Sequence, residues 1–361
     1  MIRSTSTSGR WPGPLAGLGL LALLATLACA PPEPLPEEWT LGLEELVVIG
    51  EEPVTEETAF YRIADLGVDG GGRLYVLDAG NHRVQVFSEE GDLLASRGGR
   101  GDGPGELEDP EGLWVYPDGE LLVADTRNRR VQRWGPAGDP RDPISVDFLP
   151  LDVAGTPDRL WIVRLPPPVM LWGPDTSPLV RAYDRDGNPE AGAIEPEPAE
   201  PPVFFLLRNT LRVAPRAGGG FAAAETHVNS RIRLYDEEGI RRGEIPVLYK
   251  MDAHAPLGHV PELVDDASLG RLARTCMDLE WDAANGVYWV LAGYVDRLPD
   301  DSYVVGREIY RYAEEGSYRG SIMLPHPAVA LAVGPDRSFW TADVEGVVRR
   351  YRLTDPDMAA N

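Results

Sequence analysis

The sequence has little lysine, cysteine or histidine, and each shortage excludes a class of protein. Only Lys250 is a lysine, and the 34 Lys and Arg residues stand against 58 Asp and Glu, which gives a net charge of -24. A surface with that charge repels phosphate backbones, so we expect no nucleic-acid partner. Two cysteines cannot build a disulfide framework. None of the five histidines forms the close helical pair of a zinc site, and no Gly-x-Ser-x-Gly elbow is present.

Glycine and proline, by contrast, are abundant, with 39 and 34 residues and no three-residue period. Collagen is therefore excluded, and the composition indicates a chain rich in tight turns and strands. The 43% of hydrophobic residues is enough for a packed core.

The longest apolar run, Leu15 to Ala28, follows Arg3 and Arg10 and ends directly before Cys29. It is too short to span a bilayer, so residues 1–28 are predicted to be a signal peptide. The segment from Thr26 to Cys29 resembles the lipobox of bacterial lipoproteins, which implies that Cys29 is acylated and that residues 29–42 form an acidic, proline-rich tether. Soluble export after a cleavage at Ala28-Cys29-Ala30 is the alternative. Cys276, left without a partner, is then expected to be a small buried apolar residue.

One pattern recurs six times along the chain. In each unit a β-branched residue stands three positions before an aromatic one: Val84 and Phe87, Val131 and Trp134, Val180 and Tyr183, Ile232 and Tyr235, Ile309 and Tyr312, Val348 and Tyr351. Four residues after the aromatic comes Gly91, Gly138, Gly187, Gly239 or Gly316, and Asp355 in the last unit. Each window predicts a strand that leads into a hairpin turn, because glycine tolerates the positive φ that such turns require.

Further short apolar runs precede each window, which gives about four strands per unit. Six such units predict an all-β fold, a six-bladed β-propeller with four-stranded blades over residues 43–355, followed by a C-terminal tail at 356–361. The last unit lacks a fourth strand, and the run Leu43 to Ile49 is otherwise unpaired. We therefore expect this N-terminal run to be the outer strand of the sixth blade and to close the ring.

The segment Asp78 to Phe87, together with Gly91, resembles an NHL repeat, and Asp125 to Val131 repeats its motif. The whole chain is similar to six-bladed propellers of bacterial envelopes. The wider NHL group includes protein-binding and RNA-binding scaffolds and a peptide-amidating lyase, so the resemblance implies a fold more than an activity.

The repeated Asp-x-x-Asn-x-Arg motif is interpreted as structural, because it would place similar charges around a ring rather than build one reaction centre. We expect its acids and amides to bond to turn backbone and its arginines to pair with carboxylates. The predicted turn residues are Asp78, Asn81, Arg83, Asp125, Asn128, Arg130, Glu225, Asn229, Arg231 and Asp343.

Successive strands alternate in direction, so the connections between the second and third strands of a blade and those between blades leave one face of a propeller. Every long segment belongs to this class, and we name this side the loop-rich face. Rigid scaffolds carry binding residues on such loops. The candidate ligand-binding residues are Trp172, Phe204, Phe205, Tyr294, Tyr303, His227 and Arg164. Alternatively, the aromatic side chains only pack the loops onto the blades.

We therefore expect an exported scaffold, lipid-anchored in the periplasm or at the cell surface, that binds a protein, peptide or glycan. Its only membrane contact would be the lipid anchor, and no cofactor is predicted. The alternative is a metal-dependent lyase or hydrolase with its site at the channel mouth. Asp65 and Asp278, at the starts of inner strands, are the candidate ligands for Ca²⁺, and His254 and His259 with His227 are those for Zn²⁺. The default interpretation of both aspartates is a solvated or turn-bonded acid.

Overall fold

The computed structural model describes residues 42–354 apart from 52–53, 56–57, 167–176, 197–208, 227–230, 248–272, 295, 298–302 and 305. The predicted signal peptide, Cys29, nearly all of the tether and the C-terminal tail lie outside the described residues. The described residues belong to one compact unit, Glu38–Asn361. Nowhere in the described ranges is there a helix with the length and hydrophobicity needed to span a membrane.

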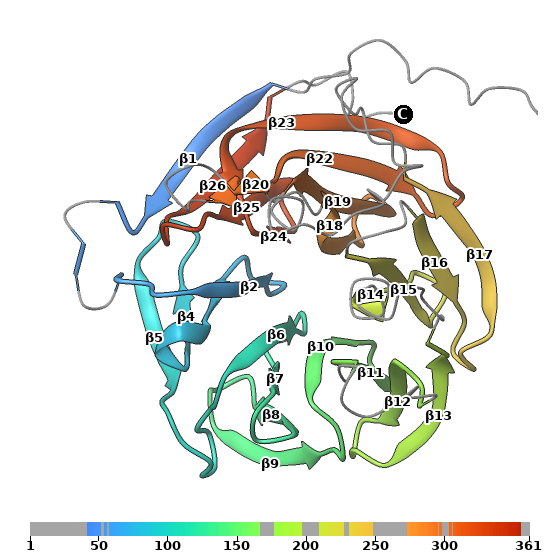
Figure 1. The fold of residues 1–361 in the computed structure, drawn as a ribbon. Helices are drawn as coiled ribbons and strands as arrows, with labels where there is room; N and C mark the ends of the chain where they lie inside the picture. Colours follow the sequence, from blue (N-terminus) through green and yellow to red (C-terminus); the bar gives the residue numbers. More distant parts are fainter. Residues whose placement is uncertain are drawn as a thin grey trace, which may run out of the picture. The chain divides into compact units, whose positions relative to one another are not determined.

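The unit is an all-β propeller of six four-stranded antiparallel sheets, the blades, set around a central axis (Figure 1). Blade 1 consists of β2 (Ile63–Val68), β3 (Leu74–Asp78), β4 (Arg83–Phe87) and β5 (Leu93–Gly98), with the 3-10 helix η1 (Ala79–Asn81) between β3 and β4. Blade 2 consists of β6 (Pro110–Val115), β7 (Leu121–Asp125), β8 (Arg130–Trp134) and β9 (Pro140–Ser145). Blade 3 consists of β10 (Pro150–Gly155), β11 (Arg159–Arg164), β12 (Val180–Asp184) and β13 (Pro189–Ile194).

Blade 4 consists of β14 (Leu211–Pro215), β15 (Phe221–Glu225), β16 (Arg231–Tyr235) and β17 (Arg241–Pro246). Blade 5 consists of β18 (Ala273–Asp282), β19 (Val287–Tyr294), β22 (Gly306–Ala313) and β23 (Tyr318–Ala328), and carries the small hairpin β20 (Asp296–Arg297) and β21 (Tyr303–Val304). Blade 6 consists of β24 (Ala330–Val333), β25 (Ser338–Ala342), β26 (Val348–Leu353) and β1 (Leu43–Ile49).

The ring closes as predicted, because the N-terminal strand β1 is the outer strand of blade 6. It pairs antiparallel with β26, from Leu43 opposite Leu353 to Ile49 opposite Val348. One sheet therefore joins the two ends of the propeller, and β26 has no open edge.

The turn glycines also lie where the repeat predicted them. All five have positive φ: Gly91 (90°), Gly138 (89°), Gly187 (90°), Gly239 (74°) and Gly316 (95°). An L side chain is strained in this conformation, which explains why glycine recurs at the turn between the third and fourth strands of a blade. The sixth position, Asp355, lies outside the described residues.

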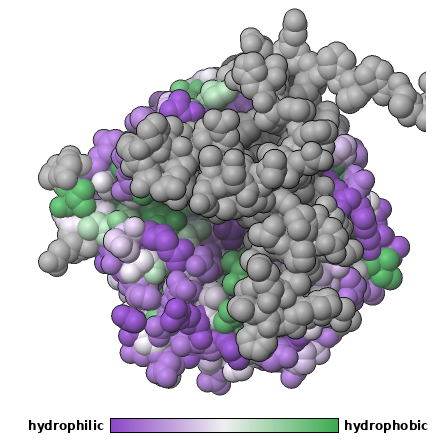
Figure 2. All heavy atoms as spheres, in the orientation of Figure 1, coloured by the Kyte–Doolittle hydropathy of each residue, from purple (hydrophilic) through white to green (hydrophobic). Residues whose placement is uncertain are grey.

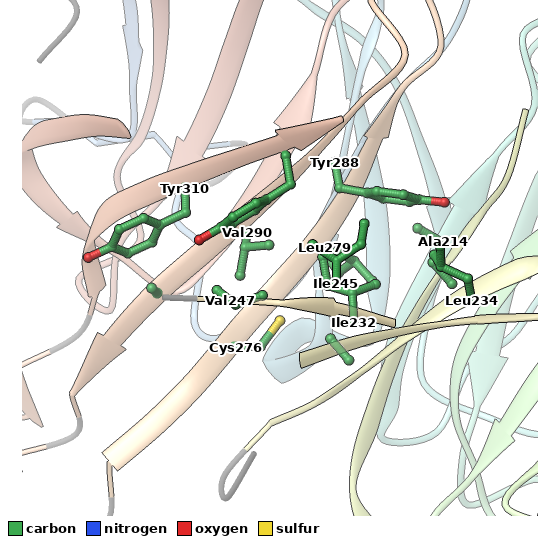
Figure 3. Close-up of a cluster of buried hydrophobic side chains, with 14 residues drawn as sticks. Ala214, Ile232, Leu234, Ile245, Val247, Cys276, Leu279, Tyr288, Val290 and Tyr310 are labelled. Carbon is green, nitrogen blue, oxygen red and sulfur yellow. The ribbon is translucent and has the colours of Figure 1, made fainter. Parts of the chain in front are cut away.

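The hydrophobic core is divided among the junctions between blades. Six clusters of buried side chains fill the six junctions, each with residues from two neighbouring blades. Figure 3 shows the cluster between blades 4 and 5, in which Ile232 and Leu234 of β16 lie close to Leu279 of β18 and Tyr288 of β19. Cys276 is 2% exposed in the same cluster, in agreement with its predicted role as a buried apolar residue. Each blade is therefore apolar on both faces and depends on both neighbours.

Arg350 adds a polar link to the junction where the ring closes. Its Nε donates to Ser338 Oγ at 3.0 Å, and its Nη2 donates to Asp336 Oδ2 at 3.0 Å, both within blade 6. Across the junction, Nη1 donates to the backbone carbonyl of Glu89 at 2.9 Å and Nη2 to the Glu89 carboxylate at 3.1 Å. Since the Arg350 side chain is 8% exposed, its loss would leave acceptors without partners at a largely buried position.

Arg350→Ala should therefore lower the free energy of unfolding by about 1–3 kcal/mol, the range for hydrogen bonds and ion pairs whose acceptors are partly exposed. Arg352→Ala is the matched control on the same strand, because its side chain is 47% exposed and lies 3.7 Å from Glu44. We expect that variant to change stability by less than about 0.5 kcal/mol. Urea unfolding followed by tryptophan fluorescence measures both, and equal losses would show that the Arg350 contacts do not stabilise the junction.

Candidate functional site

The two ends of the propeller differ in their connections. All the long connections join strand ends at the loop-rich face. They are 50–62, 99–109, 165–179, 195–210, 247–272 and the segment 295–305 that carries β20 and β21. On the opposite face, which we name the short-turn face, no connection is longer than 69–73, and all of these turns are described. The predicted asymmetry is present, and 50–62 adds a long connection that the sequence prediction did not include. Figure 2 shows that the described surface in that view is largely hydrophilic, with scattered hydrophobic patches.

Most of the predicted ligand-binding side chains lie outside the described residues. Trp172, Phe204, Phe205 and His227 all do, as do His254 and His259. The backbone of Tyr294 ends β19 and that of Tyr303 begins β21, so both residues belong to the loop-rich end of blade 5. Their role in binding stays a prediction.

Arg164 is the predicted ligand-binding residue whose side chain is described. It ends β11 and is 6% exposed, and its Nη1 donates to the backbone carbonyl of Ser177 at 3.2 Å. The guanidinium group therefore holds the connection between β11 and β12 at its C-terminal end.

The motif of blade 1 holds the connection that enters the blade. Asp78 is fully buried, and its Oδ2 accepts hydrogen bonds from Asn81 Nδ2 at 2.8 Å and from Arg83 Nε at 2.9 Å. The other oxygen accepts the backbone N–H of Tyr61 at 3.1 Å. The carboxylate thus orders the segment just before β2.

The motif of blade 2 is arranged in the same way. Oδ2 of the buried Asp125 accepts from Asn128 Nδ2 at 2.8 Å and from Arg130 Nε at 2.7 Å, while Oδ1 accepts the N–H of Glu108 at 2.7 Å. Arg130 also donates to three backbone carbonyls of the connection 99–109. Burial raises the pKa of Asp125, and these donors oppose the increase.

Blades 4 and 6 also contain an ion pair between an acidic residue and arginine at the position of the motif. The buried Glu225 lies 3.3 Å from Arg231 Nη2 and 2.7 Å from Arg233 Nη2. In blade 6, Asp343 accepts from Arg349 Nη1 at 2.8 Å and from the N–H of Val347 at 2.9 Å. Asn229 lies outside the described residues. In these blades the described side chains of the motif form hydrogen bonds and ion pairs that hold turns and connections. Few of these side chains are therefore available for a reaction.

Three buried aspartates on alternate inner strands form the most unusual feature of the propeller axis. Asp65, Asp152 and Asp278 are 6%, 4% and 6% exposed, on β2, β10 and β18. Each Oδ1 accepts the N–H of the next residue in its own strand, at 2.8, 2.9 and 2.9 Å. Each Oδ2 accepts an N–H from the inner strand of the following blade: Leu113 at 2.8 Å, Val213 at 3.0 Å and Leu331 at 2.7 Å. The carboxylates therefore tie blade 1 to 2, blade 3 to 4 and blade 5 to 6.

The intervening blades have no acid at the same register position. Gly112, Arg212 and Ala330 lie there, each directly before the residue whose N–H the neighbouring aspartate accepts. A Cβ at Gly112 would come within 2.8 Å of Asp152 Oδ1 and of the Leu151 carbonyl oxygen, so the close approach of blades 2 and 3 requires glycine. Asp65, Asp152 and Arg212 lie near the ends of the inner strands that open on the loop-rich face, and Asp278 lies at the same level on the longer strand β18.

Arg212 and Glu280 complete this group, which we name the channel-mouth cluster together with Asp65, Asp152 and Asp278. Arg212 Nε donates to the Met277 carbonyl at 3.3 Å, and its Nη1 lies 4.0 Å from Asp152 Oδ1. Burial alone would lower the pKa of Arg212, but the carboxylates of Asp152, Asp65 and Asp278 outweigh it and raise the pKa. The guanidinium group stays charged and offsets part of the negative charge.

The carboxyl groups of the cluster hold their protons more tightly than usual. Burial, opposed by Arg212, raises the pKa of Asp278 to about 6 and also raises that of Asp152. Burial raises the pKa of Asp65 and Glu280 well above their usual values, and the neighbouring carboxylates raise both further. Acids whose pKa is raised by burial are common where protons are transferred. Among the described side chains, however, no set of three or more His, Cys, Asp or Glu is arranged to hold a metal ion.

Two members of this cluster, Asp65 and Asp278, are predicted from the sequence, and three are not. Asp65 and Asp278 were proposed to face the channel mouth from strand starts, whereas Asp278 lies well inside β18, after an irregularity in its pairing with β19. Asp152, Arg212 and Glu280 were not singled out. The sequence does contain a signal, an aspartate followed by leucine or valine at the same place in every second blade. A search for a pattern that repeats in every blade does not detect it.

Comparisons with known proteins support the fold. The family model of the NHL repeat matches residues 60–87, so the first blade carries an NHL repeat. A streptogramin B lyase structure is similar with a TM-score of 0.50 and 12% identity, over 88% of this chain and 100% of that one. The hydrazine synthase of Kuenenia stuttgartiensis is similar with a TM-score of 0.50 and 9% identity, over 84% of this chain and 99% of that one. At these identities the likeness concerns the fold alone. No curated protein matches the sequence.

The raised pKa of Asp278 predicts a specific dependence of stability on pH. A carboxyl group whose pKa is higher in the folded state contributes most stability below its unfolded pKa, near 3.8, and loses this contribution as the pH rises through the folded pKa, about 6. Wild-type protein should therefore lose stability relative to Asp278→Asn between pH 4 and pH 7. Urea unfolding of both proteins across this range measures the difference.

Asp184→Asn is the control for this experiment. Asp184 is the last residue of β12 and its side chain is partly exposed, and hydrogen bonds from Asn188 lower its pKa. Its contribution has the opposite sign, because it is present above the unfolded pKa and lost as the pH falls. A stability difference between wild type and Asp278→Asn that stays constant with pH would contradict the raised pKa.

Proposed function

We propose that this protein is a binding scaffold that recognises a protein, peptide or glycan through its loop-rich face. The observation that carries the proposal is that all the long connections leave one end of a rigid propeller, while the other end has only short turns. Long loops on a rigid scaffold are the usual carriers of binding residues. The motif residues Asp78 and Asp125 support this reading, because they fix the connections to the blades in one conformation.

The channel-mouth cluster indicates the charge of the partner. It contains four carboxyl groups and the single described guanidinium of Arg212, and the whole chain has a net charge of -24. Such a surface favours basic groups and neutral hydrogen-bond donors and repels phosphate-rich ligands. Among the three partner classes, a protein or peptide with a basic segment fits best.

Purified propeller should enrich a partner from cells that express it, and Trp172→Ala or the double change Phe204→Ala and Phe205→Ala should reduce this enrichment at least about tenfold, as expected for aromatic anchors. Ile240→Ala is the matched control, since Ile240 is 53% exposed in a turn of the short-turn face. The isolated complex should also weaken with salt because the mouth is acidic. Equal enrichment by all variants, or a loss with Ile240→Ala alone, would refute binding through the loop-rich face.

A second candidate function is a metal-dependent lyase or hydrolase at the channel mouth. The buried acids with raised pKa favour it, since such groups are common where protons are transferred. One solved structure of similar fold is a streptogramin B lyase. Elemental analysis of purified protein separates the two functions: a stoichiometric, tightly bound Ca²⁺ or Zn²⁺ supports the enzyme, and its absence supports the scaffold.

We further propose that the protein is exported and lipid-anchored through Cys29, on the basis of its N-terminal sequence. Cys29→Ala should move the protein from the membrane fraction to the soluble exported fraction, because a thioether-linked lipid is the proposed anchor. Cell fractionation with immunoblotting measures this, and Cys276→Ala serves as the control. If the Cys29→Ala protein stayed in the membrane fraction, the lipoprotein assignment would be wrong.

A further inference from the structure

Three arginines converge on one buried glutamate at the junction of blades 2 and 3, on the short-turn face. Glu120 is 5% exposed, and its Oε2 accepts a hydrogen bond from Arg185 Nη2 at 2.6 Å. Arg133 Nη2 lies 3.8 Å from Oε1 and Arg141 Nη1 lies 4.0 Å from Oε2, both beyond hydrogen-bond range. A second carboxylate, Asp139, lies 3.8 Å from Arg141 Nε. Three guanidinium groups against two carboxylates leave one positive charge in surplus.

Several polar atoms of this cluster are buried without a hydrogen-bond partner. They are Arg133 Nε, Arg185 Nη1 and Glu120 Oε1, and beside them the Tyr116 hydroxyl, which interacts with the Arg185 side chain, has a proton of its own to donate. A buried charged donor without an acceptor costs a substantial part of its desolvation energy, so such donors normally face an acceptor. Apart from Glu120 Oε1, which lies 3.8 Å from Arg133 Nη2, the described side chains around these donors supply no free acceptor.

The surroundings of Tyr116 show that these polar atoms lie close to one another. It is 6% exposed, and the Arg185 guanidinium lies 3.9 Å from the centre of its ring. Burial raises the pKa of Tyr116, and Arg185, Glu120 and Arg133 are all near enough to influence it. The hydroxyl group therefore stays protonated and is a donor, like the two arginines beside it.

Two arginines at other junctions, Arg350 and Arg216, are paired with carboxylates and backbone carbonyls. Arg350 donates to Ser338, Asp336 and Glu89. Arg216 Nε donates to Glu314 at 2.8 Å and its Nη1 to the Tyr235 carbonyl at 3.0 Å. In these two examples each guanidinium group has a carboxylate partner, whereas three guanidinium groups surround Glu120.

We propose that the cluster of Arg133, Arg141, Arg185 and Tyr116 binds a small oxyanion, a carboxylate or phosphate group. The surplus charge attracts the anion, and Arg133 Nε, Arg185 Nη1 and the Tyr116 hydroxyl are the donors that would bind it. The side chains of Arg141 and Arg185 are 43% and 29% exposed, which gives the anion a route from solvent. This site lies on the face opposite the channel-mouth cluster and does not depend on the function proposed above.

The test is thermal unfolding and isothermal titration calorimetry with sodium phosphate, acetate or chloride at constant ionic strength. Phosphate or acetate should raise the unfolding temperature of the wild-type protein by about 2 °C or more at saturation, while chloride should not. Whichever of the two gives the tighter saturable binding identifies the class of oxyanion. A response to chloride equal to that of both oxyanions would overturn the proposal.

Two substitutions with opposite expected effects make the test specific. Arg133→Gln keeps most of the side-chain volume but removes a donor and a charge, and should weaken binding about tenfold or more. Glu120→Gln removes the competing carboxylate, and should tighten binding about fivefold. Arg100→Gln, whose side chain is 73% exposed on the loop-rich face, should bind like the wild type. If Arg133→Gln fails to fold, the direction of the Glu120→Gln effect still decides, because unchanged or weaker binding there would refute the site.

Discussion

The burial of both faces of every blade is the constraint on which the structure depends. Each of the six hydrophobic clusters draws residues from two blades, so no blade can cover its apolar surface alone. The ring has to close, and it closes through β1 on β26, which joins residues from opposite ends of the unit in one sheet. Arg350 reinforces the neighbouring junction with contacts to Glu89 in blade 1. Stability of the propeller is therefore a property of the whole ring, and damage at one junction exposes two blades.

The sequence predicted the parts of the fold that local chemistry determines. A β-branched residue three positions before an aromatic, with glycine four residues later, marked the third strand and the following turn of each blade, and Gly91 and its four equivalents have the required positive φ. The strand Leu43 to Ile49 was identified because it had no partner in the sequence pattern and the last unit lacked a fourth strand. These signals work because hairpin turns and alternating strands are specified by residues close together in sequence.

The channel-mouth cluster was less predictable for a physical reason. Asp65, Asp152 and Asp278 lie on three different blades. The side chain of each accepts a backbone N–H from the following blade, and that N–H comes near only in the closed ring. Gly112 and Ala330 carry no charge at the intervening positions, so the pattern has a period of two blades and escapes a search for one-blade repeats. The arginines around Glu120 likewise come from two strands of blade 2 and from a turn of blade 3, and meet only through packing. Charged groups placed by tertiary contacts leave little trace in local sequence.

The same aspartates that organise the ring also determine what its mouth attracts. Each carboxylate accepts two backbone N–H groups, yet burial and mutual repulsion raise its pKa, so the negative charge at the mouth carries an energetic cost that Arg212 offsets only in part. A cationic group that bound there would lower this cost further. Binding at the mouth and closure of the ring are then thermodynamically linked, because a ligand that binds only the folded ring stabilises it. The contacts between blades and the proposed recognition of a basic partner thus depend on one set of buried carboxylates.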